Sequence, residues 1–130
     1  MGGELELTVE QRSAPESSAH LILNLAGHAT PANHAVLTKA FQKARDELAA
    51  TTEKNGGVIL VLRELEAISS SCVGAMLSLS RDLQKADRRI VLAEVPAAIL
   101  QILDLLRLGD VFPLFASEAE ARAGLRNGPE

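Results

Sequence analysis

Three consecutive hydroxyl side chains, Ser69, Ser70 and Ser71, are the residues of this chain whose type and position best suit chemistry. They lie between an apolar segment, residues 58–62, and an amphipathic segment, residues 72–86. That pattern places them at the start of a helix, where unpaired backbone N–H groups and partial positive charge favour a serine cap and a phosphoryl group. The position therefore suits a phosphorylation switch, and it also suits a plain helix cap.

The single cysteine, Cys72, could in principle be the nucleophile of an enzyme. A thiol at a helix start is a candidate nucleophile. The histidines that could assist it are His20, His28 and His34. However, Cys72 falls on an apolar stripe with Met76 and Leu79, where a small buried thiol is the usual explanation. The histidines lack metal-ligand spacing, His34 is expected on the wet side of its helix, and no Walker-type phosphate loop is present. We therefore expect no catalytic residues, no metal and no cofactor.

Composition narrows the class of partner. The chain has 130 residues, a formal net charge of -4, three Phe and neither Trp nor Tyr. Scattered Lys and Arg without stacking aromatics argue against nucleic acid, so we expect a protein partner. One cysteine cannot form an internal disulfide, and the N-terminus lacks a signal-peptide pattern. No apolar run approaches the roughly 20 residues that span a bilayer. These features predict a cytoplasmic protein without membrane insertion.

The periodicity of apolar residues predicts an α/β domain. In residues 4–10, charged or polar side chains alternate with apolar ones, which predicts an edge strand. We expect this strand to pair antiparallel with a strand at 20–26. Thr30 and Pro31 have the types of a capping hydroxyl and a first-turn proline, so they predict a helix start. Residues 58–62 then read as a central strand buried on both faces.

Strands and helices continue to alternate in the second half of the chain. After the helix at 72–86, residues 89–93 predict a strand, and a Leu-rich helix with surplus apolar surface follows at 96–108. Gly109 is expected to stop that helix in the left-handed conformation. Residues 111–115 predict a last strand. Ser117 and Glu120 form a capping box for a last helix ending near Leu125.

The order of these elements resembles the STAS domain of anti-sigma factor antagonists over residues 4–125 or so. The resemblance implies a mixed central sheet of about four to five strands with about four helices packed against it. It implies one domain, residues 1–130, with its core at about 4–125 and a polar tail at 126–130. Self-association through the apolar helix stays open.

The serine segment carries the resemblance to this family. Family members usually read Asp-Ser-Ser-Gly-Leu-Gly there, and an anti-sigma factor that is also a serine kinase phosphorylates the first serine. The matching residues here are Ser69-Ser70-Ser71-Cys72-Val73-Gly74. The resemblance implies that Ser70 is the phosphoacceptor, with Ser69 and Ser71 as its neighbours. Ser69 replaces the aspartate, and Cys72 replaces the first glycine.

A second family segment, Gly-Glu-Leu-Asp-like, is matched only by Gly27. The residues expected to contact the partner are His28, Thr30, Ser69, Ser71, Cys72 and Gly74. The implied partner is the anti-sigma factor/serine kinase, which would be released when the serine is phosphorylated. The alternative is a STAS interaction module without a phosphosite, either a signalling scaffold or the cytoplasmic accessory subunit of a transporter.

Overall fold

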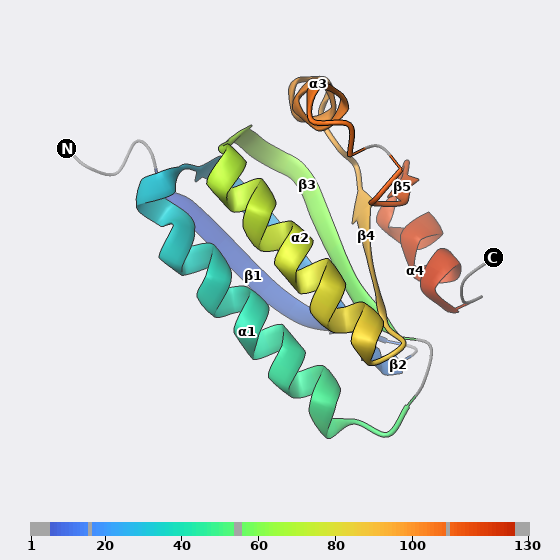
Figure 1. Cartoon of the computed structure of the whole chain (residues 1–130). Coiled ribbons are helices and arrows are strands. Elements are labelled where there is room, and N and C mark those ends of the chain that lie inside the picture. Colours follow the sequence, from blue (N-terminus) through green and yellow to red (C-terminus); the bar gives the residue numbers. More distant parts are fainter. Residues whose placement is uncertain (1–5, 16, 54–55, 109, 127–130) are drawn as a thin grey trace.

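The computed structural model describes residues 6–15, 17–53, 56–108 and 110–126 (Figure 1). Its strands are β1 (Leu7–Ala14), β2 (Ser17–Ala29), β3 (Gly57–Ile68), β4 (Arg89–Ala93) and β5 (Leu114–Phe115). Its helices are α1 (His34–Ala50), α2 (Ser70–Lys85), α3 (Ala97–Leu105) and α4 (Glu118–Arg126), with a 3-10 turn at Pro31–Asn33. The predicted order of strands and helices is confirmed over this described part.

The five strands form one mixed sheet in the order β1-β2-β3-β4-β5. β1 pairs antiparallel with β2, as predicted, and the remaining neighbours pair parallel. The predicted α/β class, with a mixed sheet of up to five strands and four helices, is thereby confirmed.

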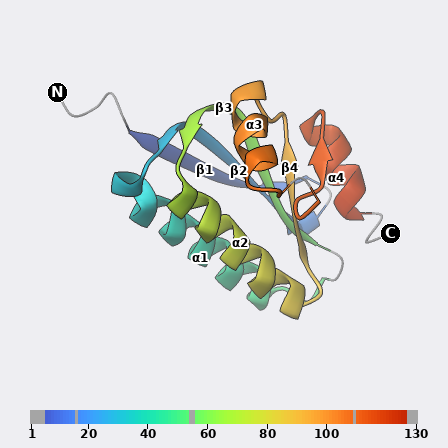
Figure 2. The same ribbon diagram turned by 45° about the horizontal axis from the view of Figure 1, so that its top comes forward.

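Two apolar clusters cover opposite faces of the sheet, because side chains alternate along each strand. α1 and α2 lie side by side across one face, and α4 packs on the other beside β4 (Figures 1 and 2). In β3, residues 58, 60 and 62 face the cluster of α1 and α2, whereas residues 59 and 61 face Ala121 and Leu125 of α4. The prediction of a central strand buried on both faces is confirmed.

The connection from β2 to α1 differs from the prediction. Thr30 makes no side-chain cap, so the expected hydroxyl cap was wrong. Pro31 instead opens a short 3-10 turn, in which the Asn33 backbone N–H donates to the Thr30 carbonyl at 2.9 Å. The Asn33 side-chain amide donates to the His28 carbonyl at 2.8 Å, which holds the turn against the end of β2. The α-helix therefore begins at His34.

The segment after α3 also differs. α3 ends at Leu105, and the residue in the left-handed conformation is Arg107, with φ of 60°. The predicted stop at Gly109 lies outside the described residues. The last strand covers only Leu114–Phe115, because Phe112 turns into the apolar core as a buried side chain.

α3 carries surplus apolar surface, as predicted. Ile99 and Leu103 are buried, whereas Leu105 is 81% exposed and Leu106 is 43% exposed. Among the helices in the described ranges, none is long and apolar enough to cross a bilayer.

Candidate functional site at the start of α2

The three serines occupy three different positions at the start of α2. Ser69 is the N-cap, and its Oγ accepts a hydrogen bond from the Cys72 backbone N–H at 3.3 Å. The Ser69 and Ser71 hydroxyl oxygens are 3.0 Å apart and share a hydrogen bond. The exposed Ser70 hydroxyl makes no hydrogen bond to any other described residue. Ser70 is therefore the member of the triplet whose hydroxyl is both accessible and uncommitted.

Cys72 fixes this helix start to the core. Its side chain is fully buried, and its Sγ donates to the Thr30 carbonyl oxygen at 3.5 Å. The Ser69 backbone N–H donates to the Ala29 carbonyl at 2.8 Å. These two contacts hold the loop after β2 beside the start of α2. A buried thiol in contact with a backbone carbonyl is a packing group, in line with the apolar stripe seen in the sequence.

The residues predicted to contact a partner are placed around this junction. His28 is half-buried at the end of β2, and its Nε2 lies 3.7 Å from Oε1 of the exposed Glu66. Thr30 is half-buried in the adjoining loop, and Gly74 is exposed one turn into α2. Ser71 is exposed as well. The structure thus brings most of the predicted set to one surface, whereas Cys72 lies beneath it.

A groove between α1 and α2 was not predicted. It opens beside Ser71 and has a volume of about 270 Å³. Its lining consists of His34, Thr38, Phe41, Arg45, Ser71, Gly74, Ala75, Ser78 and Leu79. His34 was expected on the wet side of α1 and is instead half-buried in this lining. The groove exists only because two helices pack in one register, which no single-helix pattern shows.

The first turns of the two helices that border the groove lack carboxylates. Neither α1 nor α2 has an acidic residue in its first turn, so nothing there offsets the partial positive charge of the helix ends. Residues 34–45 and 70–81 include no Asp or Glu, and their cations are Lys39, Lys43, Arg45 and Arg81. Carboxylates follow directly in both helices, Asp46 in α1 and Asp82 in α2, and Asp82 pairs with Arg45.

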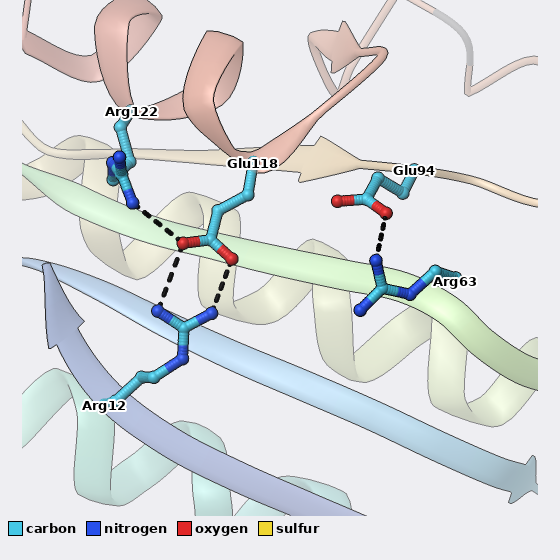
Figure 3. Close-up of polar contacts among 5 residues, drawn as sticks. All are labelled: Arg12, Arg63, Glu94, Glu118 and Arg122. Atoms are coloured by element: carbon cyan, nitrogen blue, oxygen red, sulfur yellow. Dashed lines mark hydrogen bonds and ion pairs between the residues drawn. The ribbon is translucent and has the colours of Figure 1, made fainter.

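The opposite face of the sheet has internally paired charges. Glu118 at the start of α4 accepts hydrogen bonds from Arg12 Nη2 at 2.5 Å and from Arg122 Nη1 at 2.9 Å (Figure 3). These bonds, those from Arg12 first, hold the pKa of Glu118 below its ordinary value. Arg63 pairs with Glu94 nearby at 2.8 Å. These five charged side chains thus find their partners within the chain.

A comparison of the sequence with models of protein families identifies the family of this chain. The family model described as the STAS domain matches residues 7–121. The chain belongs to the STAS domain family. No curated protein is significantly similar to it in sequence.

Solved structures show the same STAS fold. An anti-sigma factor antagonist from Mycobacterium paratuberculosis aligns with a TM-score of 0.79 at 12% identity, covering 97% of this chain and 99% of that one. The unphosphorylated anti-sigma factor antagonist SpoIIAA aligns with a TM-score of 0.75 at 19% identity, covering 95% and 100%. The phosphorylated form of SpoIIAA, a Bacillus cell fate determinant, aligns at 0.68 and 19%, covering 91% and 99%. At these identities the likeness concerns the fold.

Proposed function

We propose that this STAS domain is an anti-sigma factor antagonist of the cytoplasm, a regulatory binding protein rather than an enzyme. Its partner is an anti-sigma factor that is also a serine kinase. The unmodified domain binds this partner and thereby frees the sigma factor, and phosphorylation of Ser70 ends the binding. The observation that carries the proposal is the exposed Ser70 hydroxyl, the one of three neighbouring serine hydroxyls without a hydrogen bond to a described residue.

The two departures from the family motif do not disturb this arrangement. Ser69 caps α2 through its hydroxyl, which is the task that an aspartate side chain performs equally well at an N-cap. Cys72 adopts no positive φ, so a glycine is not needed there for backbone freedom. The backbone around Ser70 therefore keeps the form of a capped helix start.

The electrostatic consequence of phosphorylation supports a switch. A phosphoryl group adds about -1.5 to -2 charges, and it would do so at a helix start whose first turn carries no acidic residue. A partner with acidic or apolar contacts there would bind more weakly. A loss of about 2 kcal/mol lowers affinity roughly thirtyfold, which is enough to move a shared partner between two complexes.

The test is phosphorylation by the serine kinase/anti-sigma factor purified from the same host. Wild type is compared with three single variants: Ser69→Ala, Ser70→Ala and Ser71→Ala. We expect incorporation of phosphate into all chains except Ser70→Ala, and we expect phosphorylated wild type to dissociate from the kinase. Binding without any phosphate transfer would instead support the interaction module without a phosphosite, as in a signalling scaffold or a transporter subunit.

A further inference from the structure

The end of α3 exposes apolar side chains that the core does not use. α3 is anchored to the core by the buried side chains of Ile99 and Leu103. Leu105 and Leu106, at the end of the same helix, are 81% and 43% exposed. In Figure 1, α3 lies at one end of the molecule, away from α1. Exposed apolar side chains that adjoin one another in this way indicate a binding surface.

Two charges of opposite sign flank these leucines. Asp104 precedes them and Arg107 follows them, and both side chains are exposed. Arg107 is the one cation in residues 97–115. Neither Asp104 nor Arg107 forms an ion pair with any residue that the structure describes, although they are only three positions apart. Both charges are therefore available to a partner outside the chain.

Arg107 has a backbone conformation that favours glycine. Its φ is 60°, and its backbone N–H donates to the Asp104 carbonyl at 3.0 Å in the turn that ends α3. A long side chain is strained in this left-handed conformation. Glu94 shares it, with φ of 56°, and uses its side chain in the ion pair with Arg63. The turn alone does not explain an arginine at position 107, whereas a guanidinium partner outside the chain would.

The four residues at this helix end form a self-complementary pattern. Residues 104–107 read Asp-Leu-Leu-Arg, so that an anion and a cation stand at equal distances along the chain from the midpoint of the two leucines. An interface between two copies related by a two-fold axis brings the same patch of each copy together and must be complementary to itself. If the axis passes between Leu105 and Leu106, Asp104 of each copy faces Arg107 of the other.

We infer that this chain forms a homodimer through the helix end made of Asp104, Leu105, Leu106 and Arg107. The leucines of the two copies pack together across the axis, and two Asp104–Arg107 ion pairs flank them. An interface built from one helix end per copy is expected to bury less than about 1,200 Å² in total, which is typical of weak and transient complexes. The dimer should therefore form and dissociate with protein concentration.

The first experiment measures self-association without the kinase. Sedimentation velocity is recorded from about 10 µM to about 1 mM, a range that detects weak dimers. Interference optics are used because the chain has neither Trp nor Tyr. We expect the wild type to shift from monomer to dimer as its concentration rises, and Leu105→Asp to stay monomeric. Val36→Asp, at an exposed apolar position of α1, is the matched control and should dimerise like the wild type.

Two outcomes of this experiment overturn the inference. The first is a wild type that stays monomeric at the highest concentration. The second is a Leu105→Asp variant that dimerises as well as the wild type, which would place any dimer contact elsewhere. The kinase takes no part in the measurement, so either result leaves the proposed function to its own phosphorylation test.

The second experiment tests the charge pairing by reversal. Asp104→Arg and Arg107→Asp should each weaken self-association about tenfold, because each turns two ion pairs into two like-charge contacts. An equimolar mixture of the two variants should form a heterodimer, since every Arg then faces an Asp of the other chain. Thermal melting checks that both variants fold. A mixture that associates no better than either variant alone overturns the two-fold arrangement and with it the inference.

Discussion

The starts of α2 and α4 are both capped by a serine hydroxyl, but they differ in the number of acidic residues in the first turn. Ser69 caps α2 by accepting from the Cys72 N–H, and Ser117 accepts from the Glu120 N–H at 3.2 Å. The first turn of α4 holds Glu118 and Glu120, whereas the first turn of α2 holds no acidic residue. At α4 these two carboxylates offset the partial positive charge of the helix start. The start of α2 is left open to a charge from outside the chain.

The difference extends to the surroundings of each helix start. Glu118 is held by Arg12 of β1 and by Arg122 of its own helix, so that α4 is fixed to the sheet (Figure 3). Ser70 is exposed and has no such partner among the described residues, and beside it lies an open groove rimmed with hydroxyls. The charged groups at the start of α4 contact one another, whereas the Ser70 hydroxyl at the start of α2 remains exposed.

The largest expected difference between the two helix starts appears when the same negative charge is added at each. Ser70→Asp should weaken kinase binding by about 2 kcal/mol, or roughly thirtyfold, because it places a negative charge at the position where phosphorylation would end the binding. It should not lower the melting temperature, because an acidic residue in the first turn stabilises a helix. Calorimetric titration and thermal melting measure the two effects.

Ser117→Asp is the matched control for that experiment. It adds the same charge at the start of α4, on the other face of the sheet, and should leave kinase affinity unchanged. Equal weakening by both variants would mean that net charge alone governs binding, and the comparison would fail.

The two capping serines, Ser69 and Ser117, should contribute about equally to stability. Ser69→Ala and Ser117→Ala should each lower the free energy of unfolding by about 1 kcal/mol, because each leaves a helix N–H without its acceptor. Urea denaturation gives both values. If Ser69→Ala is as stable as wild type, the Ser69 hydroxyl does not cap α2.

Acid should lower the free energy of unfolding by protonating Glu118 at the start of α4. Its pKa is lowered by Arg12, so the pair stabilises the folded state fully above the ordinary glutamate pKa of about 4.3, and this contribution is lost as pH falls through the lowered value. Because the pair is partly exposed, Glu118→Gln should cost no more than about 1 kcal/mol at pH 7.

Urea denaturation from about pH 7 to pH 3 tests this dependence. The loss of stability in acid should be smaller for Glu118→Gln than for wild type. Asp104→Asn, at an exposed position of α3, is the control and should follow the wild-type curve. Identical acid curves for Glu118→Gln and wild type would contradict the account of this ion pair.

The smallest expected effect concerns Gly74. Gly74→Ala should raise the free energy of unfolding by about 0.5 to 1 kcal/mol, since alanine is the better helix former and nothing obstructs its Cβ. Chemical denaturation measures the change. A destabilised Gly74→Ala would show that the glycine serves the fold.

The sequence predicts the elements of this fold because each is encoded locally. The two-residue alternation of β1, the apolar run of β3 and the capping residues of α4 are all visible within a few positions. What it cannot show depends on residues far apart in the chain. Arg12 and Glu118 are separated by 106 positions, and the groove depends on how α1 packs against α2.

In the candidate site, too, only the features encoded by neighbouring residues could be predicted from the sequence. The position of the serines at a helix start follows from their place between an apolar strand and an amphipathic segment. Which hydroxyl is uncommitted does not, because Ser69 and Ser71 bond to each other only once the turn has formed. The missing cap at Thr30 has a similar cause: the amide of Asn33 fixes the turn that Pro31 opens.

The most direct measurement is phosphosite mapping of the protein isolated from its native host, with intact mass to give the stoichiometry. We expect a single phosphate on Ser70 under conditions in which the kinase is active, none on Ser117, and none on a Ser70→Ala chain. Phosphate on Ser117 or Ser71 with Ser70 unmodified, or no phosphate under any growth condition, would contradict this expectation.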